Sequence, residues 1–90
     1  MGRESKAKRA IEAAEDGEDG KGVFWVIYDF EGTRNPSKFY RNLAYVLGRY
    51  AGERIQKSVV EMRSLRGARA VEALALSYGA KVRRAKIVEG

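Results

Sequence analysis

Any general base on this 90-residue chain has to be a carboxylate, a lysine, a tyrosine or a metal-bound hydroxide, because the sequence contains neither histidine nor cysteine. That composition excludes thiolate zinc sites, disulfides, Ser-His triads and cysteine nucleophiles. The candidate catalytic and metal-binding residue is Asp29, at the end of an apolar run that starts at Val23. Its carboxylate suits Mg²⁺ or Mn²⁺, which can activate water for phosphodiester cleavage. Glu31 and Glu61 are candidate additional ligands, and the alternative role of Asp29 is to cap the following turn.

Basic side chains are the second chemically useful set. Residues 1–22 hold five basic and six acidic side chains of the chain's 18 and 12, so residues 23–90 hold thirteen and six, a net charge of +7. Such an excess is typical of a protein that binds a polyanion, and it is also found on ordinary solvated surfaces. The candidate nucleic-acid-binding residues are Arg34, Lys38, Arg41, Arg54, Lys57, Arg63 and Arg66.

The elements that position these residues begin after residue 22. Residues 1–22 contain one large aliphatic side chain, Ile11, and a glycine-rich stretch at 17–22, so we expect a flexible or marginally helical tail. Residues 23–90 are the predicted folded domain. No apolar run is long enough to span a membrane, and no apolar signal region is visible, so we expect a cytoplasmic protein with no membrane partner.

Apolar patterns, bounded by glycine, proline and capping residues, divide residues 23–90 into strands and helices. In chain order these are a strand at 23–30, a helix between Pro36 and Gly52, one strand or a hairpin at 53–63, a helix between Ser64 and Gly79, and a strand at 81–89. The order predicts an α+β fold of the ferredoxin-like split βαβ type (β-α-β-β-α-β). Both helices are then expected on one face of an antiparallel sheet.

The first predicted strand is apolar on both faces. Phe24 and Val26 point one way while Trp25 and Ile27 point the other, and the two helices can cover only one side. An exposed apolar face of that size is a liability, and Ile11 alone offers too little surface for residues 1–22 to cover it. We therefore expect a homodimer formed face to face.

Two segments resemble the Cas-two family of CRISPR-associated proteins. Tyr28-Asp29 matches the strand end of that family, and Gly52–Glu61 (GERIQKSVVE) matches its segment with an Arg-Ile/Val-Gln-x-Ser-Val core. The resemblance covers residues 23–89 and implies a ferredoxin-like homodimer that handles nucleic acid. In that family the strand-end Asp of both protomers lies near the dimer axis and is implicated in metal-dependent cleavage of RNA or DNA. Val60 and the loop after Asp29 depart from the family pattern, which favours a divergent or stand-alone relative.

Two functions remain open at this stage. The first is a metal-dependent endonuclease for RNA or DNA that uses Asp29 with Mg²⁺ or Mn²⁺, in a CRISPR or other defence or mobile-element context. The second is a non-catalytic nucleic-acid-binding or scaffold protein of the same fold. The resemblance also implies an integrase-type protein as a partner, because some members of the family bridge DNA in the spacer-integration complex.

Overall fold

The computed structural model describes residues 5–31 and 37–87, which form three helices and four strands. In chain order they are α1 (Lys6–Glu15), β1 (Lys21–Asp29), α2 (Ser37–Tyr50), β2 (Glu53–Gln56), β3 (Val59–Ser64), α3 (Leu65–Ser77) and β4 (Lys81–Ile87). The α+β class is confirmed, and residues 53–63 form the hairpin rather than the single strand. The expected order of six elements is preceded by a further helix, α1. Arg34, and Pro36 at the predicted start of α2, lie outside the described residues.

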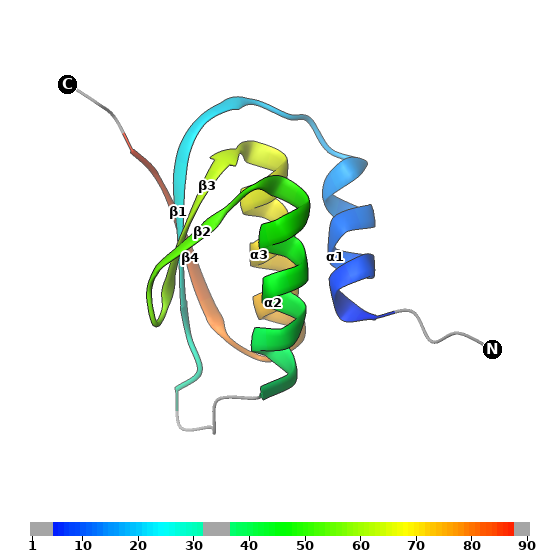
Figure 1. Cartoon of the computed structure of the whole chain (residues 1–90), viewed down its shortest axis with the longest axis vertical. Coiled ribbons are helices and arrows are strands. Elements are labelled where there is room, and N and C mark those ends of the chain that lie inside the picture. Colours follow the sequence, from blue (N-terminus) through cyan, green and yellow to red (C-terminus); the bar gives the residue numbers. More distant parts are fainter. Residues whose placement is uncertain (1–4, 32–36, 88–90) are drawn as a thin grey trace.

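The four strands make one sheet in the order β2-β3-β1-β4, and every neighbouring pair is antiparallel. Helices α2 and α3 lie on one face of this sheet, and α1 lies beyond them on the side away from the strands (Figure 1). The molecule is therefore built of three layers: the sheet, the pair α2 and α3, and α1. The other face of the sheet is covered by none of the three helices.

Local signals set the helix ends. Ser64 caps α3, because its Oγ accepts a hydrogen bond from the Gly67 amide at 3.0 Å. At the end of α2 the chain turns through Ala51, whose φ of 55° lies in the left-handed region, and the Gly52 amide then donates to the Leu47 carbonyl at 2.8 Å. A Cβ at position 52 would collide with the Met62 sulfur, so glycine lets α2 lead closely into β2.

The core lies between the sheet and the pair α2 and α3. Alternate residues of β1 point into it, so Phe24, Val26 and Tyr28 are buried while Trp25 and Ile27 face the other way. The 3.6-residue periodicity of the helices supplies the opposite wall. Its fully buried side chains are Phe39, Leu43, Val46, Ala68, Val71, Leu74 and Ala75. Phe39 packs edge to face against Tyr28, with ring centroids 5.0 Å apart.

Helix α1 is attached mainly to α3 and to a smaller extent to α2. It buries three alanines, Ala7, Ala10 and Ala14, which recur on one face of the helix. Small side chains let two helix backbones approach closely, so this helix docks with little large apolar surface of its own. The boundary at residue 22 stays a prediction, but residues 6–15 are a helix in contact with the rest of the chain.

Polar contacts at both ends hold α1 in place. At its first turn, the Ala7 amide donates to the Asn42 side chain at 3.1 Å, and the Lys6 ammonium donates to the Ser77 carbonyl at 2.9 Å. At its last turn, Glu15 accepts a 2.7 Å hydrogen bond from the Tyr50 hydroxyl. Burial, with a smaller contribution from this bond, raises the pKa of Tyr50 to about 12.

Candidate nucleic-acid interface

Four of the predicted nucleic-acid-binding residues gather toward one end of the molecule. The first turns of α2 and the β2–β3 hairpin turn both point to this end (Figure 1). All four side chains are exposed, and none forms an ion pair with another described residue. We call this surface the basic end and define it by Lys38, Arg41, Arg54 and Lys57.

The basic end is fixed to the core through two tyrosines. The Arg54 guanidinium lies 4.7 Å from the ring centroid of Tyr40 on α2, so a cation–π contact links β2 to the helix. The Tyr28 hydroxyl donates a 3.0 Å hydrogen bond to the backbone carbonyl of Lys57 and so holds the hairpin turn. Burial raises the pKa of Tyr28 to about 12, and the nearby Arg54 opposes this rise. Tyr28 therefore keeps its proton, and with it this bond, throughout the neutral range.

Arg66 is not part of the basic end, because its contacts are structural. Its Nε donates to the Gly17 carbonyl at 3.2 Å, and its guanidinium lies 3.6 Å from the Glu15 carboxylate. Its amide donates to Asp19, and this bond, with that of the Gly20 amide, lowers the pKa of Asp19. Arg66 thus ties the start of α3 to the segment that follows α1.

Arg63 lies on the sheet face that no helix covers, away from the basic end. It pairs with Glu61 on the same strand at 3.2 Å. Glu61 also accepts a 3.0 Å hydrogen bond from the indole N–H of Trp25, its direct cross-strand neighbour on β1. The predicted extra metal ligand Glu61 therefore already has two partners. It lies four residues from Asp29 along the sheet, roughly 13 Å at about 3.3 Å per residue.

Asp29 is exposed at the end of β1, where it faces Lys81 of β4 across the strand pair. Glu31 forms a 3.0 Å ion pair with the same lysine. The three side chains line an open surface hollow together with Ile27, Val82 and Arg83. Within residues 5–31 and 37–87, no three acidic side chains lie close enough together to hold a metal ion. One described copy of the chain thus brings two carboxylates to this hollow, those of Asp29 and Glu31, and Glu31 is already paired with Lys81.

The uncovered face of the sheet has an apolar centre and charged edges. We call it the open sheet face. Its apolar side chains, all partly or fully exposed, are Val23, Trp25, Ile27, Val59, Ala85 and Ile87. Among residues 5–31 and 37–87, the charged side chains on the same face are three acidic and three basic: Asp29, Glu53, Glu61, Arg63, Lys81 and Arg83. This face is therefore charge-balanced, unlike the basic end.

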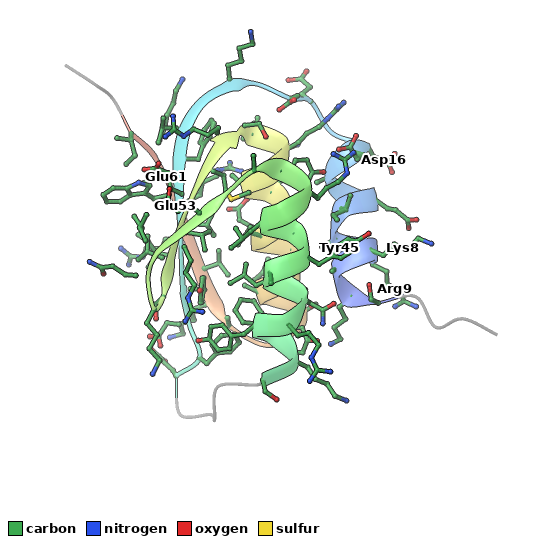
Figure 2. All side chains as sticks on the ribbon, in the orientation of Figure 1. Lys8, Arg9, Asp16, Tyr45, Glu53 and Glu61 are labelled. Carbon is green, nitrogen blue, oxygen red and sulfur yellow. The ribbon has the colours of Figure 1, made fainter. Side chains whose placement is uncertain are left out.

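Glu53 is a feature that the sequence did not single out. It lies directly opposite Glu61 across the β2–β3 pair, and the two carboxylates share the side of the sheet away from the helices (Figure 2). Like charges directly opposite each other destabilise a strand pair. A hairpin with its turn at residues 57–58 pairs position 53 with position 61. The sequence could therefore have predicted this pair of glutamates, but only with the register of the hairpin known.

Comparisons with protein-family models, with curated proteins and with solved structures found no match to this chain. The fold and the surface chemistry are therefore the basis for the function. Among the described residues, no helix has both the length and the apolar character needed to cross a membrane.

Proposed function

We propose that this chain is a nucleic-acid-binding protein that acts as a homodimer and contacts the phosphate backbone through the basic end. The observation that carries the proposal is the set Lys38, Arg41, Arg54 and Lys57, four exposed cations with no acidic partner among the described residues. Neutralising backbone phosphates releases counterions, which gives sequence-independent affinity that falls with salt. Binding of this kind is sufficient for a non-catalytic scaffold protein, which needs no catalytic residues.

The fold assignment within this proposal is the ferredoxin-like split βαβ for residues 21–87. Its support is the strand order β2-β3-β1-β4 with antiparallel neighbours and with α2 and α3 on one face. A link to the Cas-two family, an integrase-type partner, a role in defence and a cytoplasmic location rest on the sequence alone. The resemblance suggests the first three, and the lack of a long apolar run or signal region in the sequence suggests the cytoplasmic location.

A double substitution with a matched control tests the binding surface. Lys38→Gln with Lys57→Gln removes two charges from the basic end, whereas Lys8→Gln with Lys21→Gln removes two exposed charges elsewhere. Both variants carry the same net charge, so only a local site distinguishes them. We expect the first variant to bind a duplex or a single strand of RNA or DNA at least about tenfold more weakly than the second, because two phosphate contacts are lost. Equal losses would contradict the proposal.

Cleavage is the second candidate function, and the position of Asp29 favours it. The Tyr28 amide donates a 3.0 Å hydrogen bond to the carbonyl of Ser58, which lies in the hairpin turn next to Lys57. Asp29 is the next residue after Tyr28, so it lies close to this turn. A phosphate held at the basic end would then lie on the same side of the molecule as this carboxylate. A pair of Asp29 carboxylates from two copies would supply oxygen ligands for Mg²⁺ or Mn²⁺.

Comparing Asp29→Asn with the wild-type chain on RNA and on DNA, in Mg²⁺ and in EDTA, separates the two functions. A nuclease loses cleavage in the variant and in EDTA while it keeps its affinity for nucleic acid. Equal cleavage by both proteins would exclude Asp29 as the catalytic residue. Binding without cleavage in every condition would assign the scaffold function.

A further inference from the structure

The open sheet face carries two features that a single copy leaves unbalanced. Its centre exposes large apolar groups, with Ile27 36% exposed and the chain's only tryptophan, Trp25, lying beside it. At one edge, Glu53 and Glu61 stand directly opposite each other, and Glu53 has no ion-pair partner among the described residues. An apolar centre with a charged rim is the usual anatomy of a protein–protein interface.

The missing cations are present at the opposite edge of the same face. Arg83 on β4 faces outward opposite Ile27, and it forms no ion pair with any described residue. Lys81 lies two residues before Arg83 and points to the same side of β4. Glu61 is paired with Arg63, and Lys81 with Glu31, so the charges left unpaired among the described residues of this face include Glu53 at the β2 edge and Arg83 at the β4 edge. The apolar centre separates these two edges, which we call the acidic edge and the basic edge. Such a face complements a copy of itself that has been turned over.

We propose that two copies pack through their open sheet faces about a two-fold axis that runs parallel to the strands, so that Arg83 of each copy meets Glu53 of the other. The inference rests on the homodimer proposed above and deepens it by naming the surface, the axis and the pair of residues. Rotation about such an axis places β4 of one copy over β2 of the other. The acidic edge of each copy then faces the basic edge of its partner.

The register supports this pairing. Glu53 is level with Trp25, and Arg83 is level with Ile27, so the two side chains are offset by two residues, roughly 7 Å, along the strands. Two sheets pack about 10 Å apart, and the long arginine side chain bridges such an offset. A two-fold axis across the strands would instead stack β2 on β2 and β4 on β4. Acidic edges would then face acidic edges, and the repulsion between like charges disfavours that arrangement.

The direction of this axis has a consequence for binding. Rotation about a line parallel to the strands leaves the direction along the strands unchanged, so the basic ends of both copies point the same way. Up to eight cations are then presented together at one end of the dimer, twice the four of a single copy. One nucleic acid can engage both copies at once, and the second contact becomes intramolecular.

Charge exchange tests the pairing of Glu53 with Arg83. We expect Glu53→Arg alone and Arg83→Glu alone each to weaken the dimer at least about tenfold, because each places like charges face to face. The double variant restores opposite charges in swapped positions and should dimerise within about threefold of the wild type. Lys8→Glu, a charge reversal on the far layer, serves as the control and should leave the dimer unchanged.

Two readouts cover the test. Light scattering gives the mass in solution, and the emission of Trp25 reports burial of the open sheet face as the protein is concentrated. A circular dichroism spectrum confirms that each variant is folded. A wild-type chain that stays monomeric with unchanged emission, or a double variant that stays as weak as the single ones, overturns the inference. Nucleic-acid binding is scored separately with the Lys38 and Lys57 variant, so failure of the interface and failure of the binding surface are distinguishable.

Discussion

Removing Lys57 from the basic end should change how binding depends on salt. If all four cations of the surface contact phosphates of a duplex, the slope of log affinity against log salt is about −0.9 for each, or about −3.6 per copy. Raising the salt from about 50 to 200 mM then weakens binding by about 150-fold. Lys57→Gln leaves three cations, a slope of about −2.7 and a loss of about 40-fold over the same range. The hairpin turn should survive the change, because the Tyr28 hydroxyl is bonded to the backbone carbonyl of Lys57.

Fluorescence anisotropy with a labelled duplex, titrated at several salt concentrations, measures these slopes directly. Lys8→Gln on α1 is the matched control and should keep the wild-type slope. A dimer that uses both basic ends on one duplex should double the wild-type slope to about −7, so the same titration also counts the copies that touch the nucleic acid. A slope that is the same for the wild type and for Lys57→Gln would refute the assignment of this lysine to the interface.

Three further predictions concern the fold. Phe39→Ala empties a fully buried site and should lower the free energy of unfolding by about 3–5 kcal/mol in a urea titration, with unaltered stability arguing against the core as described. Ala10→Leu overpacks the buried face of α1 and should cost about 1–3 kcal/mol, with faster amide exchange across residues 6–15; unchanged exchange would mean that α1 is not docked. Tyr28 and Tyr50 have pKa values raised to about 12, above the unfolded value near 10, so the folded state holds both protons more tightly. Stability should be at its full value below about pH 10 and fall between about pH 10 and 12, and Tyr50→Phe should reduce that fall; an equal fall in the variant would assign it to other groups.

Local signals predicted most of the elements correctly. The β-branched and aromatic run after residue 22 became β1, and Ser64 caps α3 because a serine oxygen can reach the amide three residues later. The hairpin at residues 53–63 was one of the two alternatives that the local pattern left open, the other being a single strand. Each of these features depends on residues close together in the chain, and sequence periodicity reports such features well.

The docking of α1 was beyond the reach of that reasoning. Its buried face consists of alanines, which add nothing to a hydrophobic pattern, and the partner of its first turn, Asn42, lies 35 residues further along. The same difficulty explains Arg66. Its predicted role in nucleic-acid binding stays a prediction, but its partners within the chain, Glu15 and the Gly17 carbonyl, are set by tertiary structure. The four cations of the basic end are exposed, as is usual for charged residues, and their contact with nucleic acid stays a prediction.

The attachment of α1 also orders events during synthesis of the chain. The Lys6 ammonium donates its hydrogen bond to the carbonyl of Ser77, a residue that is made 71 residues later. At roughly 5–20 residues per second, the helix segment spends several seconds outside the ribosome before its partner exists. During this time the segment exposes little apolar surface to other nascent chains, because the face that it later buries consists of alanines and the rest carries charges of both signs. The first helix of the chain to be made can thus dock only after α3 has been made.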